Sequence, residues 1–576
     1  MRVLLLHPDD AFCGSWIAQR WDSVVDLGRA PRSFYDECSA RLGIPVFSIF
    51  DLAREVQDLQ IWRGLLELGM GRVMDRFGID WWDVVGLLLQ PELQDVRLAL
   101  RLAEKLSGCR TLVASRPSMI ADAMQLQLGI PLEVLHRGVG KRLVASVLRR
   151  GRAAANLSLA QLRQVIFDKY DPRYGWRKKI ARLPRRSSEP VVLLPTAYSN
   201  VTKTALSYAR VLPEQRFLLV LARESGEVSP VPGNVQTANL AAFATGKGDR
   251  EELQTLEVRW KQMEQSLREH PEFRLPIQIG ILKKGPRWLR WGLPVRDAWN
   301  QVFETRSVVG CLSADDSNPY TRIPLLLARQ RGIPAVACHH GALDCRMAFK
   351  KLQFSNYLAK GEMERDYLER ICGVDAGRIQ VGATPAPPRE NPSLWSERAP
   401  WIVFFTEPYE TDLWRVEAIY REVLPRLCAA ARKSGKRVVL KVHPFESARQ
   451  RRRLVKRILS KEDQKLVNVT DALLSREILQ KTWCAVTVES TVAFECASAG
   501  IPAFLCGWLR HAYAGYAPQY ARFDVGQMLE SPDDLLRIPG TLRAAIPALD
   551  TASRLVQAIS PPALSALLCQ PPSGLR

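Results

Sequence analysis

Histidines are few in this chain, and two of them are adjacent at the end of a predicted strand. Of seven histidines, His339 and His340 follow the apolar run 333–338, and Gly341 comes directly after them. Ligands of parallel α/β sheets bind at the carboxyl ends of strands, and glycine lets a backbone approach a ligand closely. Since neighbouring strand residues point to opposite sides, we expect one imidazole to face a cleft and the other to pack. Two histidines satisfied by local hydrogen bonds are an equally good interpretation.

Two carboxylates follow the preceding apolar run. Asp315 and Asp316 come after the predicted strand 307–313, and Arg322 lies near the start of the helix that follows. We therefore expect Asp315, Asp316 and His340 to lie at one sheet edge, with His339, Gly341 and Arg322 lining the cleft around them.

A further set of polar residues follows the strands of the last third of the chain. The run VVLKV ends in His443 and Pro444, and proline keeps the histidine backbone extended. The next candidates are Glu489, Ser490 and Thr491, where a strand ends and a helix begins, a place where hydroxyl and N–H groups can bind an anion. Glu495 could accept hydrogen bonds from a sugar diol. The alternatives are an exposed histidine, a plain helix cap and a paired carboxylate.

The elements around these residues alternate between short apolar runs and helical patterns. Such alternation predicts parallel sheets with helices on both faces. The apolar run 190–196 starts a second α/β unit and 401–407 a third. Residues 62–89 are interpreted as an inserted helical piece. The predicted strands are 2–6, 23–28, 45–50, 111–115, 131–135, 190–196, 216–222, 276–282, 307–313, 333–340, 378–383, 401–407, 437–444, 466–470, 483–491 and 501–506.

This alternation divides the chain into six segments. They are an N-terminal Rossmann-like α/β region (1–150), a basic linker (151–187), a first half-domain (188–384), a Pro-rich linker (385–400), a second half-domain (401–550) and a tail (551–576).

Composition and charge restrict the class of protein to which this chain can belong and the partners that it can bind. The 576 residues are 47% hydrophobic and 24% charged, which excludes a disordered or collagen-like chain. The net charge of +21 favours contact with polyanions or phosphate-bearing substrates. The basic segment 137–187 suggests an anionic membrane surface as a partner, although a solvated helix face with a connector is the plainer interpretation.

Other features restrict location and chemistry. The twelve cysteines include no CxxC pair, so we expect buried thiols, no zinc site and no cofactor. The N-terminus lacks the pattern of a signal peptide, and no apolar run is long enough to cross a membrane. We therefore expect a cytoplasmic location, with peripheral contact to the inner membrane face left open. GxxxxGK[ST], a dinucleotide-binding GxGxxG and GxSxG are all absent.

The order of these motifs resembles that of bacterial GT-B fold glycosyltransferases of surface and capsular polysaccharide biosynthesis. It is also similar to their relatives, the CDP-glycerol glycerophosphotransferases and UDP-N-acetylglucosamine 2-epimerases. The resemblance covers about 300–550 well and 190–300 loosely. It implies an α/β protein with two Rossmann-like domains facing a cleft, here with an additional N-terminal α/β region.

The resemblance also implies roles for individual residues. The His443-Pro444 motif is similar to that of sialyl-, polysialyl- and Kdo-transferases, where it contacts the nucleotide phosphate. Ser490 and Thr491 would contact phosphate or nucleotide, and Glu495 the ribose. Only five residues separate Glu489 from Glu495, which departs from the seven of the commonest retaining group.

The implied activity is metal-independent transfer of a sugar from a nucleotide-sugar donor to a surface polysaccharide or lipid-linked glycan acceptor. In that reaction a general base would take the proton of the acceptor hydroxyl, and the candidates are Asp316, Asp315 and His340. An epimerase or glycerophosphotransferase on the same fold is the first alternative. A non-catalytic protein that binds RNA or lipid is an alternative of another class, but the chain lacks a basic platform interleaved with aromatic residues, so no nucleic acid partner is expected.

Overall fold

The chain forms three parallel β-sheets, which are distributed over two units. A computed structural model describes residues 1–8, 10, 12–53, 64, 66–135, 186–223, 226–244, 249–341, 356–384, 394–407, 413–443, 446–472, 474–509, 517–548 and 550–569. Unit 1 consists of Met1–Val56, Gln94–Leu143 and Pro388–Leu555, and unit 2 of Gln57–Leu93, Val144–Pro387 and Val556–Arg576. The basic residues 137–185 and Pro444 lie outside the described residues. The six predicted segment boundaries stay a prediction.

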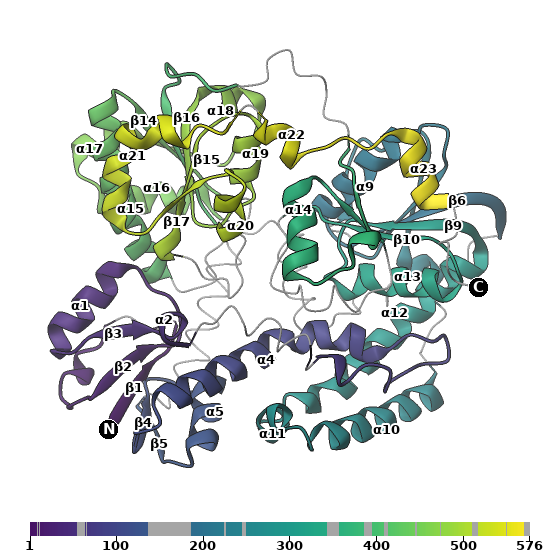
Figure 1. The fold of residues 1–576 in the computed structure, drawn as a ribbon, viewed down its shortest axis with the longest axis horizontal. Coiled ribbons are helices and arrows are strands. Elements are labelled where there is room, and N and C mark those ends of the chain that lie inside the picture. Colours follow the sequence, from purple (N-terminus) through teal and green to yellow (C-terminus); the bar gives the residue numbers. More distant parts are fainter. Residues whose placement is uncertain are drawn as a thin grey trace. The chain divides into compact units, whose positions relative to one another are not determined.

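The N-terminal sheet of unit 1 has the strand order β3-β2-β1-β4-β5. Its strands are β1 (Arg2–Leu6), β2 (Ser23–Asp26), β3 (Val46–Ser48), β4 (Thr111–Ala114) and β5 (Leu132–Val134), and its helices are α1 (Arg32–Leu42), α2 (Ile49–Ala53) and α5 (Met119–Leu128) (Figure 1). The predicted strand 45–50 is therefore too long, because the chain turns into α2 at Ile49. The boundary between the units falls inside α4 (Trp81–Lys105), after Leu93.

The sheet of unit 2 has the order β12-β11-β10-β9-β6-β7-β8. Its strands are β6 (Ser187–Thr196), β7 (Phe217–Leu221), β8 (Val235–Asn239), β9 (Arg306–Ser313), β10 (Ala335–Cys338), β11 (Asn356–Ala359) and β12 (Ile379–Val381). Its helices are α9 (Ser199–Val211), α10 (Arg250–Leu267), α11 (Pro271–Gln278), α12 (Gly285–Thr305), α13 (Pro319–Gln330), α14 (Glu362–Asp366) and α23 (Pro561–Cys569). The central strands are buried along most of their length, as expected for a parallel sheet covered on both faces.

One predicted strand of this unit is wrong. Residues 276–282 belong to the end of α11 and to a short 3-10 helix, Leu282–Lys284. Their apolar residues alternate as in a strand, but Pro271 starts a helix whose apolar face is buried. The third strand in sequence is instead β8, an edge strand with mostly exposed or half-buried residues. Such a strand has too little apolar patterning to be recognised.

The C-terminal sheet of unit 1 has the order β15-β14-β13-β16-β17-β18. Its strands are β13 (Trp401–Phe405), β14 (Arg437–Lys441), β15 (Val467–Thr470), β16 (Thr482–Thr487), β17 (Ala503–Cys506) and β18 (Gln527–Leu529). Its helices are α15 (Leu413–Ser434), α16 (Ala448–Ile458), α17 (Lys461–Leu466), α18 (Arg476–Lys481), α19 (Val492–Ser498), α20 (Ala517–Arg522), α21 (Ile538–Thr541) and α22 (Thr551–Leu555).

All three sheets share one topology. The first strand of each lies in the interior, the second and third extend to one side, and the fourth and later strands extend to the other. This is the doubly wound Rossmann order, in which ligands bind where the strand order reverses. The predicted α/β class, with Rossmann-like sheets and an additional N-terminal α/β region, is therefore confirmed. Among the described residues, no helix is both long and apolar enough to cross a membrane.

Within unit 1, the N-terminal and C-terminal sheets are joined through the buried carboxylate of Glu422 on α15. Its Oε2 accepts from the N–H of Ser33 at 2.9 Å, and its Oε1 accepts from the indole N–H of Trp508 at 2.5 Å. Ser33 lies in the first turn of α1, where a negative charge stabilises a helix. One carboxylate therefore connects a helix of each sheet.

Within unit 2, the end of the described chain covers the sheet. The N–H of Ile559 donates to the carbonyl of Ala383 at 2.8 Å, and Leu564 and Leu568 of α23 are fully buried in the core. A Cβ built at Gly310 on β9 would lie only 2.0 Å from the carbonyl oxygen of Leu568. Only glycine therefore fits where α23 crosses the sheet.

Candidate functional site

His443 lies just beyond β14, at the carboxyl edge of the C-terminal sheet. Its backbone N–H contacts Oγ1 of Thr406 at 3.0 Å and Oε2 of Glu446 at 3.1 Å. Glu446, whose side chain is 4% exposed, also accepts from the hydroxyl of Thr406 and forms an ion pair with Arg451 at 2.5 Å. A buried ion pair therefore fixes the backbone that carries the imidazole.

The imidazole of His443 is half-buried, and its surroundings favour the neutral form. Burial lowers the pKa of His443, and the ammonium group of Lys441 lowers it further, while Glu446 opposes both effects. A neutral imidazole keeps one N–H donor. His443 can therefore donate one hydrogen bond to an anion at neutral pH.

Glu407 organises the loop that begins beyond β16. Its Oε1 accepts from the backbone N–H of Glu489 at 2.6 Å and from the hydroxyl of Thr487 at 3.0 Å. Burial raises the pKa of Glu407, and these hydrogen bonds oppose the rise. The N–H of Glu489, which the sequence suggested for a phosphate, thus contacts a carboxylate of the protein itself.

The hydroxyl residues of this loop lie next to that carboxylate contact. Ser490 and Thr491 are half-buried, and Oγ of Ser490 accepts from the N–H of Val492 at 3.4 Å. Glu495 follows on α19 and is exposed. An anion at this turn would therefore meet side-chain hydroxyls rather than the N–H of Glu489.

The structure brings His443 and the 489–491 loop to the same sheet edge, one on each side of β13. The link is the pair Thr406 and Glu407, which directly follows β13 and contacts both sides. Neither residue was predicted from the sequence. Their position after the first strand of a doubly wound unit, where the strand order reverses, is the signal that could have found them.

In unit 2 the equivalent edge carries Tyr198, which follows β6. Its hydroxyl donates to Oδ2 of Asp315 at 2.9 Å and lies 3.2 Å from Nε2 of His340. The rings of Tyr198 and His340 pack edge to face, with centroids 5.1 Å apart. Asp315 is 4% exposed, whereas His340 is only partly buried. Carboxylate, phenol and imidazole thus form one hydrogen-bonded chain with the imidazole outermost.

The expectation that His339 and His340 point to opposite sides is wrong. Their rings stack, with centroids 5.0 Å apart and planes at 22°. The reason is that β10 ends at Cys338, so the strand alternation no longer applies to either residue. His339 is 7% exposed, and its Nδ1 accepts from the N–H of Gly341 at 3.3 Å, which closes the turn.

Asp316, a candidate general base, and Arg322, expected to line the cleft, are both almost completely buried. Asp316 is 1% exposed, and its Oδ2 accepts from the hydroxyl of Tyr357 at 3.1 Å. Arg322, predicted to line a cleft, is also 1% exposed and donates to the carbonyl of Asp316 at 2.9 Å. The cause is an ion pair that holds its guanidinium against Asp83. Arg322 therefore supports the turn instead of lining an open surface.

Lys360, immediately after β11, fixes the glycine of the histidine turn. Its Nζ donates to the carbonyl of Gly341 at 3.1 Å and forms an ion pair with Glu364 at 2.6 Å. No sequence pattern pointed to Lys360, because β11 itself was not predicted. Within the described ranges, no three or more His, Cys, Asp or Glu side chains are grouped so as to hold a metal ion.

Comparison with known proteins gives similarity to solved structures only. No protein-family model matches the chain, and no curated protein matches it. A UDP-N-acetylglucosamine 2-epimerase from Listeria monocytogenes is similar at 11% identity and a TM-score of 0.40, over 66% of this chain and 94% of that one. The Neisseria meningitidis UDP-GlcNAc 2-epimerase bound to UDP-GlcNAc gives 10% identity and 0.38, over 66% and 97%. The lipopolysaccharide outer core galactosyltransferase WaaB gives 10% and 0.38, over 66% and 99%. Because these identities are low, the function proposed below rests on this chain's own residues.

Proposed function

We propose that this protein is a glycosyltransferase that moves a sugar from a nucleotide-sugar donor to a glycan or lipid-linked acceptor of surface polysaccharide synthesis. The observation that supports it is the edge of the C-terminal sheet, where His443 and the 489–491 loop flank β13 at the reversal of the strand order. Doubly wound sheets bind nucleotides at this position.

The C-terminal edge would hold the donor phosphates. The N–H of neutral His443 and the hydroxyls of Ser490 and Thr491 can donate to phosphate oxygens, and Pro444 would keep the backbone extended there. The exposed carboxylate of Glu495 can accept from the ribose hydroxyls. These donors would stabilise the negative charge that develops on the leaving phosphate in a metal-independent reaction.

The edge of the unit 2 sheet would supply the general base. Of the three candidates, Asp316 and Asp315 are buried, whereas His340 is partly exposed. His340 would take the proton of the acceptor hydroxyl as the new bond to the anomeric carbon forms and the bond to phosphate breaks. Tyr198 and Asp315 would orient the imidazole.

The first experiment is calorimetry with CMP-, UDP-, GDP- and CDP-linked donors. The tightest of them should bind more weakly to His443→Ala and Ser490→Ala. The matched control for His443→Ala is His270→Ala, at the start of α11. The matched control for Ser490→Ala is Ser475→Ala, which removes the N-cap of α18 in unit 1. Unchanged affinity in both test variants, with the folds intact, would refute the assignment of this edge.

Product analysis then identifies the reaction class. Glycosylated acceptor supports transfer, whereas an epimerised UDP-sugar or a glycerophosphate product would replace it with one of the two related activities. Tight RNA binding that weakens steeply with salt, without any thermal shift by a nucleotide-sugar, would exclude the enzyme proposal altogether.

Contact with an anionic membrane through 137–187 is a separate proposal, supported by the charge of that segment. Co-sedimentation should be stronger with vesicles rich in anionic lipid than with neutral vesicles. Equal sedimentation with both would contradict it.

A further inference from the structure

A loop of unit 2, residues 74–80, precedes α4 and is organised by the carboxylate of Asp75. Its Oδ1 accepts from the N–H groups of Phe77 and Ile79 at 2.8 and 2.9 Å. Its Oδ2 accepts from the indole of Trp81 at 3.0 Å and pairs with the fully buried Arg296 at 2.8 Å. One buried side chain therefore fixes both the loop and the start of α4.

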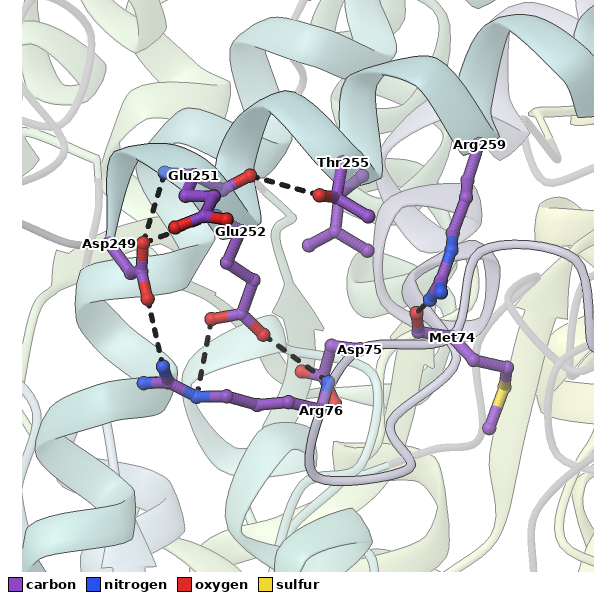
Figure 2. A pocket seen from close by; sticks show the side chains of 9 residues that line it. Met74, Asp75, Arg76, Asp249, Glu251, Glu252, Thr255 and Arg259 are labelled. Atoms are coloured by element: carbon purple, nitrogen blue, oxygen red, sulfur yellow. Dashed lines mark hydrogen bonds and ion pairs between the residues drawn. The ribbon is translucent and has the colours of Figure 1, made fainter.

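Ion pairs attach the same loop to α10 (Figure 2). Arg76 reaches Asp249 at 3.0 Å and Glu252 at 3.4 Å, and the guanidinium of Arg259 donates to the carbonyl of Met74. Arg76, Asp249 and Glu252 are paired with one another there, and Asp75 pairs with Arg296, so this network is a structural clamp. On its other side, the same loop lines a cavity.

The loop and α13 together line a cavity of about 650 Å³. Its walls are largely apolar or glycine, with four polar side chains among them. The lining residues are Met70, Gly71, Met74, Gly78, Ile79, Asp80, Asp83, Leu326, Arg329, Gln330 and Gly332. Volumes of this size hold small organic ligands, which are usually recognised by a few polar groups in an apolar setting.

Asp83 carries an unsatisfied hydrogen-bond acceptor in this cavity wall. The side chain is 1% exposed, and its Oδ1 is paired with Arg322. Its Oδ2 is buried and has no hydrogen-bond partner within the described part of the chain. Leaving such an acceptor without a donor is costly, so a ligand that donates to Oδ2 would stabilise the site.

Asp80 adds a second carboxylate to the same wall. It accepts from the N–H groups of Gly71 at 2.7 Å and Trp82 at 3.1 Å. Burial raises the pKa of Asp80 to about 6, and the charge of Asp83 contributes to the rise. A cationic group between the two carboxylates would offset the cost of burying their negative charges and would reduce the repulsion between them. Arg329 also lines the cavity, where burial lowers its pKa to about 10.

We propose that this cavity binds a small molecule that carries a protonated amine on an apolar body. The ammonium group donates to Oδ2 of Asp83 and lies near Asp80, and the apolar body contacts Met70, Met74, Ile79 and Leu326. The site is distinct from the site proposed for sugar transfer, because none of these residues belongs to either sheet edge; Asp83 is joined to Asp316 through Arg322.

The test is calorimetry on the full chain with two probes of the same shape, benzylamine, which is protonated at pH 7.5, and benzyl alcohol. Because a charge-assisted hydrogen bond replaces a neutral one, benzylamine should bind about tenfold more tightly or better. Equal affinities, a preference for the alcohol, or no binding of either probe at millimolar concentration overturns the proposal.

Variants locate the binding. Asp83→Asn should abolish the preference for benzylamine, Asp80→Asn should reduce it, and Leu326→Trp should weaken both probes by filling the cavity. Glu257→Gln is the matched control, since Glu257 pairs with Arg290 and does not line the cavity. If Asp83→Asn fails to fold because it weakens the pair with Arg322, Asp80→Asn and the probe pair still decide. Unchanged benzylamine affinity in the folded carboxylate variants contradicts the site.

Discussion

The C-terminal sheet of unit 1 and the sheet of unit 2 have the same strand order but use the point of reversal differently. In the C-terminal sheet, Glu407 follows the first strand and accepts hydrogen bonds from the next loop, so it fixes backbone. In unit 2, Tyr198 follows the first strand and joins Asp315 to His340, so it connects groups that can move protons. Topology determines where polar residues gather, and the side chain at that position determines their chemistry.

The strongest test of this difference is His340→Ala. Loss of a general base should lower kcat for sugar transfer about 100-fold or more, with little change in donor affinity. His443→Ala should do the reverse and mainly weaken donor binding. If His340→Ala instead weakens donor binding as much as His443→Ala does, the two edges are not specialised as proposed.

Glu407 tests the structural side of the comparison. Glu407→Ala should lower the free energy of unfolding by about 2 kcal/mol, because the N–H of Glu489 and the hydroxyl of Thr487 lose their acceptor. Glu407→Gln keeps one acceptor oxygen, so its free energy of unfolding should fall by about half as much. Urea denaturation measures both values, and an alanine variant as stable as the parent would show that the carboxylate does not fix the loop.

Tyr198→Phe should have a smaller effect, on catalysis. It removes one hydroxyl that contacts Asp315 and His340, which amounts to about 1 kcal/mol or a roughly fivefold lower kcat. The pH profile of kcat should shift as well, since the environment of the imidazole changes. Tyr208→Phe is the control, because Tyr208 donates to the carbonyl of Gly382 and contacts neither group. If the pH profile of kcat shifts equally in Tyr208→Phe, Tyr198 does not position the imidazole.

The smallest expected effect is a pH dependence confined to the C-terminal edge. Burial holds the pKa of His443 below its ordinary value, so the free protein carries a neutral imidazole at pH 7. A bound diphosphate favours the imidazolium, so donor affinity should rise a few-fold as the pH falls below about 6.5. Calorimetry between pH 7.5 and 5.5 should show this rise in the parent and not in His443→Gln. A rise of equal size in the variant would point to another group.

Most of the fold could be predicted from local apolar patterns, because buried parallel strands are short, continuous apolar runs. The strands β8, β11 and β18 and the helix α11 were not predicted; β8 lacks such a run, and α11 imitates one. At the sites, residues that end strands were found directly.

The residues that contact these strand ends were harder to predict from the sequence. Glu407 and Tyr198 lie at positions that topology alone would have indicated. The pairing of Asp83 with Arg322 joins residues 239 apart in sequence, and no local pattern contains it.

The return of the chain at Val556 has a consequence for how the protein is made. After Pro387 the polypeptide leaves unit 2, contributes its whole C-terminal sheet to unit 1, and only then supplies the helix whose carbonyl lies against Gly310. On the ribosome, the apolar face that α23 covers stays open until the whole C-terminal sheet of unit 1 has been synthesised. The sheet of unit 2 has all its strands by Val381 but is covered by α23 only after residue 556, so a nascent chain stalled before that residue would expose it to aggregation.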